Sequence, residues 1–197
     1  MSDITLDRKE VLPKLFPHPE NYLLLTGLAG AAKDTAAYTK EADNLLTLGG
    51  AMGAAVSMAL GVALSAPQEQ VAVITGDGEL MMNIGALATV ASMMPDNFTI
   101  VCIDNGMHGE TGGQPGHTAR RTNLALMAEG AGIPSVMTIQ SPEQLDVAYE
   151  FLQDTPAPRF LWVRVTASPP SNYKRNWDLV EGRLKFRNAY LAKTQTA

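Results

Sequence analysis

Two apolar stretches decide the fold of this chain: residues 71–75 (VAVIT) and residues 98–104 (FTIVCID). Both are short, rich in β-branched residues and continuous, which is typical of strands buried on both faces of a parallel sheet. The first runs into Gly76-Asp77-Gly78, and the second runs into Asn105-Gly106. A helical pattern over residues 79–93 lies between them, so the sequence predicts a strand–helix–strand unit with both turns at one edge of the sheet.

The same alternation continues along the chain. Residues 27–40 read as a loop running into a short helix, and residues 105–119 as a long Gly-rich loop, which in a compact domain is usually functional or mobile. Further strands are predicted at residues 21–26, 135–139 and 160–165, and further helices at residues 3–15, 48–64, 123–131, 143–152 and 177–191. The pattern predicts an α/β fold with a doubly wound, mostly parallel sheet and helices on both faces. The length predicts a single domain over residues 1–197.

Composition argues against several classes of function. The formal net charge of -5 does not favour nucleic acid as a partner. The charged N-terminal stretch MSDITLDRKE lacks the apolar region of a signal peptide, and glycines and polar residues interrupt the apolar stretches, so we expect no membrane span and a cytoplasmic location. Cys102, the single cysteine, lies within an apolar strand and is expected to be a buried thiol.

The two turns contain the side chains that could bind a metal ion and a phosphate group. Ligands of doubly wound sheets bind beyond the carboxyl ends of the strands. The Asp77 carboxylate and the Asn105 amide oxygen are hard ligands, which suit Mg²⁺ or Ca²⁺ better than zinc. Gly76 and Gly78 would let a diphosphate approach the backbone, and a helix starting near Glu79 would point its N–H groups at that anion. Each turn alone also reads as an ordinary turn, but their shared position favours a metal and phosphate site.

The span from Gly76 to Asn105 resembles the diphosphate-binding motif of thiamine diphosphate enzymes, in which GDG is followed after a characteristic interval by Asn. Many members end this motif with Asn-Asn, where this chain has Asp104-Asn105. The resemblance implies thiamine diphosphate and Mg²⁺ as cofactors. It also implies Asp77, Asn105 and the backbone carbonyl of Met107 as the metal ligands.

A second segment, residues 49–53 (GGAMG), is similar to the part of the same family that lines the middle of the cofactor. In that family a bulky apolar side chain holds the cofactor bent, and Met52 is the matching residue here; packing within a helix is the alternative role for Met52. The cofactor contacts that the resemblance implies are Gly50, Met52, Gly76, Asp77, Gly78, Glu79, Asn105, Met107, His108 and Gly109.

Residues 103–118 (IDNGMHGETGGQPGHT) are similar to β subunits of sulfopyruvate decarboxylases and, less closely, to phosphonopyruvate decarboxylases. The resemblance covers about residues 20–170. It implies decarboxylation of a small anionic 2-oxo acid, with sulfopyruvate as the first candidate. Phosphonopyruvate, another 2-oxo acid and carboligation are alternatives. Outside this chemistry, the alternatives are a non-catalytic scaffold and a nucleotide-binding module, for which GLAG at residues 27–30 lacks the three-glycine fingerprint.

The long loop also offers ionisable groups. His108 and His117 are candidate catalytic residues, because histidine titrates near neutral pH and can move protons. Arg120 and Arg121 are candidates for binding the anionic substrate, with a solvated charge pair as the alternative. Lys33, which follows an early strand, could face the same site.

The resemblance implies that the chain forms half of an active site. Thiamine diphosphate enzymes combine a domain that binds the diphosphate with one that binds the pyrimidine and supplies an activating glutamate. The 197 residues of this chain correspond to one domain, of the kind that binds the diphosphate. We therefore expect a pyrimidine-binding partner subunit, in an α₂β₂ or larger assembly.

Overall fold

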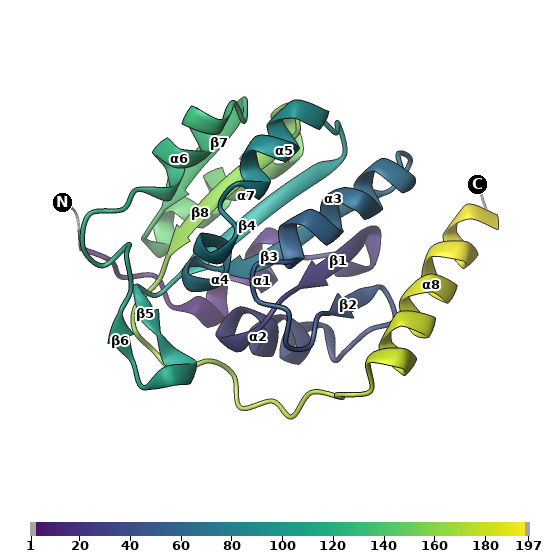
Figure 1. Cartoon of the computed structure of the whole chain (residues 1–197), viewed down its shortest axis with the longest axis horizontal. Coiled ribbons are helices and arrows are strands. Elements are labelled where there is room, and N and C mark those ends of the chain that lie inside the picture. Colours follow the sequence, from purple (N-terminus) through teal and green to yellow (C-terminus); the bar gives the residue numbers. More distant parts are fainter. Residues whose placement is uncertain (1–2, 196–197) are drawn as a thin grey trace.

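The centre of the molecule is a six-stranded sheet, shown in Figure 1 for a computed structural model that describes residues 3–195. Neighbouring strands are all parallel, in the order β2-β1-β3-β4-β8-β7. The strands are β1 (Tyr22–Thr26), β2 (Leu45–Thr47), β3 (Gln70–Gly76), β4 (Phe98–Asp104), β7 (Ser135–Ile139) and β8 (Arg159–Arg164). The order reverses direction between β1 and β3, as in a doubly wound sheet. The predicted fold class is therefore confirmed.

Helices cover both faces of this sheet. One face carries α3 (Ala55–Ser65), α5 (Ala86–Met93), α6 (Leu124–Ala131) and α8 (Leu179–Gln195), and the other carries α1 (Arg8–Leu15), α2 (Ala29–Thr39) and α7 (Leu145–Asp154). Successive strand residues point to opposite faces, so Val73 and Ile100 join one core while Ile74 and Val101 join the other. This two-sided burial explains the continuous apolar runs in the sequence.

The Cys102 thiol lies on β4 inside one of these cores and is fully buried. Burial raises the pKa of this thiol well above its ordinary value, and the charge of Asp104 adds to the effect. A thiol in this state is protonated and inert. The prediction of a buried core cysteine is confirmed.

Two predicted helices have different boundaries. The helix expected over residues 48–64 begins at Ala55, because Gly50 and Gly53 adopt φ angles of +82° and +84° and form a turn. The helix expected over residues 79–93 is split into α4 (Asp77–Met82) and α5. At the break, the side chain of Asn83 donates to the carbonyl of Gly53 at 3.1 Å. This bond ties the turn to α4.

Three further elements differ from expectation. Strand β2 is three residues long, too short to give a periodic signal, and was not predicted. Helix α1 begins at Arg8 rather than near residue 3, because the Asp7 side chain accepts the backbone N–H of Lys9 and caps the helix. The long loop contains a small hairpin of β5 (Met107–His108) and β6 (Gln114–Pro115), joined through a 3₁₀ turn, Gly109–Thr111.

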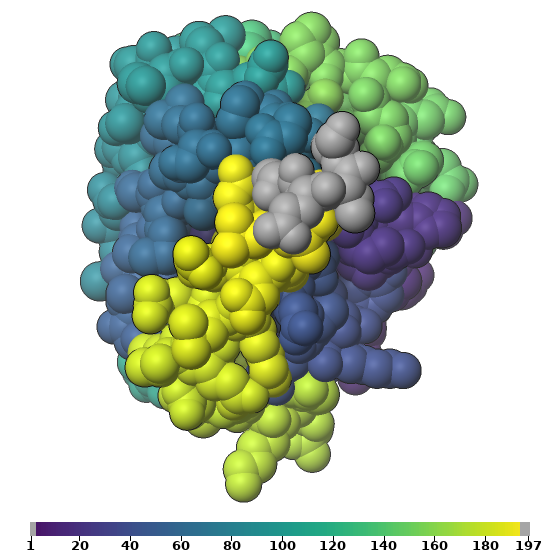
Figure 2. All heavy atoms as spheres, turned by 90° about the vertical axis from the view of Figure 1, so that its right-hand side faces the viewer, coloured from purple at the N-terminus to yellow at the C-terminus, as the bar shows by residue number. Residues whose placement is uncertain are grey.

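Helix α8 lies on the outside of the molecule. Figure 2 shows it in yellow across the segment that holds β2 and α3. Phe186 is buried against the core, and the Tyr190 hydroxyl donates to the carbonyl of Ser65 at 3.4 Å. None of the helices formed by residues 3–195 has the length and apolar character needed to cross a membrane.

Candidate functional site

The candidate site lies at the carboxyl edge of the sheet, where α4 and the β5–β6 hairpin gather in Figure 1. Asp77 directly follows β3, and Asp104 is the last residue of β4. Strand pairing sets Gly76 opposite Ile103, which places the two aspartates side by side. Both carboxylates are buried. The sheet therefore brings together the two turns that the sequence singled out.

Three hydrogen-bond donors fix the Asp104 carboxylate. Its Oδ1 accepts the backbone N–H of Gly106 at 2.7 Å and the hydroxyl of Thr118 at 2.8 Å. Its Oδ2 accepts the indole N–H of Trp162 at 2.8 Å, from the neighbouring strand β8. Hydrogen bonds to an ionised acceptor are stronger than neutral ones, so this network holds the turn that carries Asn105.

The end of the long loop closes on Asp77. The hydroxyl of Thr118 also lies 3.3 Å from Asp77 Oδ2. A Cβ atom on Gly116 would come within 3.1 Å of the same oxygen and 3.2 Å of the Gly106 carbonyl, which is a tight contact on both sides. The loop and both strand ends thus converge on one carboxylate.

Asp77 is electrostatically unusual. Burial, followed by the nearby charge of Asp104, raises the pKa of Asp77 to about 7, against hydrogen bonds from the Gly78 N–H and Thr118 that lower it. A divalent cation would offset the cost of holding two carboxylates in this place. The Asp77 carboxylate is thus suited to hold a cation.

The candidate metal ligands at this site are oxygen atoms. Asn105 Oδ1 accepts the N–H of Met107 at 3.1 Å, and an amide oxygen has a second lone pair for a cation. Within residues 3–195 no three His, Cys, Asp or Glu side chains gather as a metal cluster. One carboxylate with neutral and phosphate oxygens is a set that Mg²⁺ accepts. The residues present fit that ion.

Glu79 lies between the ends of β1 and β3, where the strand order reverses. Its Oε2 lies 3.2 Å from both the backbone N of Leu28 and the hydroxyl of Thr75, and each donates to it, whereas its Oε1 has no hydrogen-bond partner. The carboxylate leaves no space for a Cβ at Gly27. Burial raises the pKa of Glu79, and the Leu28 and Thr75 bonds lower it. Beyond the cofactor contact expected from sequence, Glu79 joins the ends of two strands.

The two candidate catalytic histidines lie near the Gly76-Asp77-Gly78 turn. A Cβ on Gly78 would be 3.0 Å from Nδ1 of His108, so this imidazole packs directly on the turn. The His117 ring meets the His108 ring edge-to-face, with centroids 6.3 Å apart. His117 is exposed and His108 half-buried. The hairpin and the turn that follows it therefore bring both rings to the same edge as Asp77.

Other predicted site residues lie around this point. The turn with Gly50 and Met52 precedes α3, and the Met52 side chain is 45% exposed, so it does not pack inside a helix. Gly109 lies at the exposed tip of the hairpin. Lys33 on α2 forms a 3.0 Å ion pair with Glu110 of the hairpin.

Two of the predicted candidates are exposed, and two further residues join the site. Arg120 and Arg121 are exposed in the turn after His117. Thr118 and Trp162 are part of the site through Asp104. Thr118 stands within the quoted loop motif, but a strand tryptophan such as Trp162 gives no sequence signal for this role.

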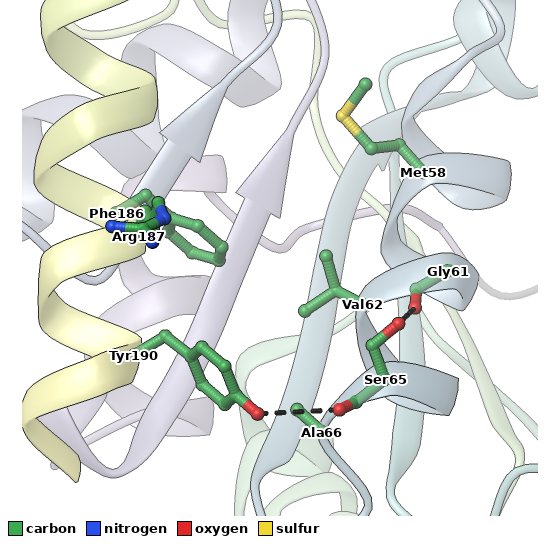
Figure 3. A pocket seen from close by; sticks show the side chains of 8 residues that line it. All are labelled: Met58, Gly61, Val62, Ser65, Ala66, Phe186, Arg187 and Tyr190. Atoms are coloured by element: carbon green, nitrogen blue, oxygen red, sulfur yellow. Dashed lines mark hydrogen bonds between the residues drawn. The ribbon is translucent and has the colours of Figure 1, made fainter. Parts of the chain in front are cut away.

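A separate hollow of about 350 Å³ lies between α3 and α8 (Figure 3). Met58, Val62 and Phe186 make its lining mainly apolar. Among the described residues, those that line it include no acidic residue, histidine or cysteine. Its side chains therefore offer little acid–base or metal chemistry.

Known proteins share this sequence and fold. Residues 29–163 match the family model of the thiamine pyrophosphate enzyme, C-terminal TPP binding domain. Sulfopyruvate decarboxylase subunit beta from Methanocaldococcus jannaschii is 33% identical over 143 residues, covering 73% of this chain and 75% of that protein. Phosphonopyruvate decarboxylase from Streptomyces hygroscopicus is 38% identical over 108 residues, 55% of this chain and 26% of that protein.

A solved structure shows the same fold. Benzoylformate decarboxylase from Polynucleobacter necessarius superposes with a TM-score of 0.70 at 19% identity, over 87% of this chain and 36% of that one. The family resemblance drawn from the sequence is confirmed. The chain belongs to the thiamine pyrophosphate enzymes, as a member of their C-terminal TPP-binding domain family.

Proposed function

We propose that this chain is the thiamine diphosphate- and Mg²⁺-binding subunit of a 2-oxo acid decarboxylase, which converts sulfopyruvate to sulfoacetaldehyde and CO₂. The observation that carries the proposal is the convergence of Asp77 and the Asn105 turn, locked through Thr118. The similarity to sulfopyruvate decarboxylase β subunits supports the substrate. Phosphonopyruvate, or another 2-oxo acid, is the second candidate substrate, supported by the next relatives.

Asp77, Asn105 and the carbonyl of Met107 would hold the metal ion. Gly76, Gly78, Glu79 and Gly109 would line the diphosphate side, with Gly50 and Met52 along the middle of the cofactor. When bound, thiamine diphosphate supplies the electron sink that lets CO₂ leave. His108 and His117 would move protons at the mouth of the site, since the His108 ring packs on Gly78 and the His117 ring contacts the His108 ring.

The whole chain, residues 1–197, would form one diphosphate-binding domain. A partner subunit would bind the pyrimidine and supply the activating glutamate, in a cytoplasmic α₂β₂ or larger assembly. Relatives that are named as β subunits support a partner. The exposed Met52 side chain fits the same arrangement, because an apolar cofactor contact is expected to be covered in the complete site.

Isothermal titration calorimetry of the full chain with thiamine diphosphate, with and without Mg²⁺, tests the cofactor assignment. We expect Asp77→Asn to weaken Mg²⁺-dependent binding about a hundredfold or more, since even residues behind a metal ligand contribute about 10–100-fold. Asp96→Asn makes the same change at an exposed position before β4, at the opposite end of that strand, and should bind like wild type. Normal cofactor affinity in Asp77→Asn would refute the metal assignment.

The substrate is tested with the chain and its partner subunit purified together. CO₂ release is measured from sulfopyruvate, phosphonopyruvate and pyruvate. We expect sulfopyruvate to give the highest kcat/KM; a higher value for phosphonopyruvate would replace the substrate assignment. Failure of the wild-type chain to bind the cofactor would instead favour a scaffold or nucleotide-binding role.

A further inference from the structure

The segment that joins β8 to α8, residues 165–178, crosses the carboxyl edge of the sheet. In Figure 1 it runs along the lower side of the molecule, from the β5–β6 hairpin to the start of α8. Two acidic side chains of the α2 region hold it: Asp34 Oδ1 accepts the N–H of Ser171 at 2.7 Å, and Glu41 Oε1 accepts the N–H of Asn176 at 2.8 Å. Asp34 is itself fixed by a buried ion pair with Arg8. The segment is therefore held firmly on both sides of Arg175.

Arg175 is the buried cation of this segment. Its side chain is 6% exposed, and its Nη1 is buried with no hydrogen-bond partner. One face of the guanidinium lies on the Trp177 ring, with Cζ 4.4 Å from the ring centroid. Arginine keeps its charge in proteins and presents five N–H donors. A buried, incompletely hydrogen-bonded cation is costly, so its position calls for an anionic partner.

Three carboxylates act on Arg175, and two of them have other partners. Burial lowers the pKa of Arg175, while the charges of Glu110, Glu41 and Glu79 raise it, so these groups lie close enough to act on it. Glu110 is paired with Lys33, and Glu41 accepts a backbone N–H. Among the described residues, none of the three donates or accepts a hydrogen bond with the guanidinium. They keep it charged and leave its Nη1 edge unpaired.

We propose that Arg175 binds a tetrahedral oxyanion, of phosphate or sulfonate type, at the carboxyl edge of the sheet. The inference deepens the proposed function and rests on it, since a cofactor diphosphate and a substrate sulfonate are the two sources of such an anion there. The planar fork of arginine matches two oxygens of this kind of group. Because the family match ends at residue 163, Arg175 would be a contact supplied by the segment that follows the family domain.

The nearby Glu79 and Glu110 add to the argument for selectivity. The carboxylates of Glu79 and Glu110 repel an incoming anion, so only an anion that hydrogen-bonds directly to the guanidinium is expected to bind here. The two anchors at Asp34 and Glu41 hold the backbone before the ligand arrives, which reduces the ordering cost of binding. The site would thus favour a well-fitted oxyanion over a loosely associated one.

The test uses the full chain and two probes, inorganic diphosphate with Mg²⁺ and sulfoacetate, each titrated by calorimetry. Arg175→Gln removes the charge and the fork, and Arg175→Lys keeps the charge but removes the fork. Lys174→Gln is the matched control, because it removes the same charge from an exposed neighbouring side chain of the same segment. We expect Arg175→Gln to weaken binding of at least one probe about tenfold or more, the size of a charge-assisted hydrogen bond.

The pattern of losses identifies the source of the anion. A loss confined to diphosphate assigns Arg175 to the cofactor, and a loss confined to sulfoacetate assigns it to the substrate's acid group; Lys174→Gln should stay within about twofold of wild type in both cases. Unchanged binding in Arg175→Gln, equal losses in the control, or a wild-type chain that binds neither probe overturns the proposal. If Arg175→Gln does not fold, equal affinities of Arg175→Lys and wild type overturn it.

The Arg175 variants and the Asp77 variant can fail independently of each other. Cofactor binding that survives Asp77→Asn refutes the metal assignment but leaves a loss in Arg175→Gln standing. Cofactor binding that depends on Asp77, together with diphosphate and sulfoacetate binding that are both unchanged in Arg175→Gln, refutes the oxyanion contact alone.

Discussion

Replacing Asp104 by asparagine tests the hydrogen-bond network that holds the Asn105 turn. The change keeps the shape of the side chain and gives the Asn-Asn pair found in many thiamine diphosphate enzymes. Oδ1 could still accept from Gly106 and Thr118. The new amide N–H₂ group, however, would face the indole N–H of Trp162, where the carboxylate now accepts a 2.8 Å hydrogen bond.

The expected cost follows from these contacts. Losing a charge-assisted hydrogen bond costs about 1.5–3 kcal/mol, and leaving a buried donor unpaired costs about 1–3 kcal/mol more. Removal of the repulsion between Asp77 and Asp104 offsets part of this cost. We therefore expect Asp104→Asn to lower the free energy of unfolding by about 2–5 kcal/mol.

A double-mutant cycle with Trp162→Phe isolates the donor clash. Trp162→Phe alone removes a donor and part of a buried ring, and should cost about 2–4 kcal/mol. In the double variant the asparagine amide no longer meets an indole N–H, so the combined cost should fall short of the sum by about 1 kcal/mol or more. Urea unfolding followed by far-ultraviolet circular dichroism measures all four free energies without relying on tryptophan fluorescence.

Two results would refute this reasoning. One is an Asp104→Asn variant as stable as wild type, which would mean that the Trp162 bond contributes nothing. The other is additivity of the two substitutions within about 0.5 kcal/mol, which would mean that the two side chains do not interact.

Three further outcomes are expected. Gly116→Ala should destabilise the fold by about 1–3 kcal/mol in a urea titration, because its Cβ would press on Asp77 and on the backbone. The control Gly130→Ala, in open space on α6, should stabilise the fold by about 0.5–1 kcal/mol. An unchanged stability in Gly116→Ala would contradict the close approach. Asp34→Asn should lower the free energy of unfolding by about 3–5 kcal/mol, since it leaves the buried Arg8 without its counter-charge. A loss below about 1 kcal/mol, the value of an exposed ion pair, would contradict this. Thiamine diphosphate with Mg²⁺ at about a hundred times Kd should add about 2.7 kcal/mol, or roughly 5–10 °C in Tm, and EDTA should reverse the shift; a Tm insensitive to EDTA would oppose the metal.

Much of the fold was readable from local pattern. The runs at residues 71–75 and 98–104 are continuous and β-branched, and such runs are stable as strands wherever they are covered on both faces. The predicted sheet type was correct for this reason, whereas the family was correct because the motif from Gly76 to Asn105 resembles that of thiamine diphosphate enzymes. Boundaries failed where glycine conformation decided them: Gly50 and Gly53 adopt positive φ angles that end the apparent apolar helix, and periodicity does not encode φ.

The sequence by itself determined that two polar turns follow two buried strands, because strand length and burial are local properties of the chain. It also placed Asn105, His108 and His117 within one loop. What only the tertiary structure decided is which distant groups meet these turns. Trp162 reaches Asp104 because β8 lies beside β4, although 58 residues separate them in the chain. Arg175 lies near Glu79 because the segment before α8 crosses the sheet edge. Contacts of this kind depend on strand order and chain path, which no local pattern of residues specifies.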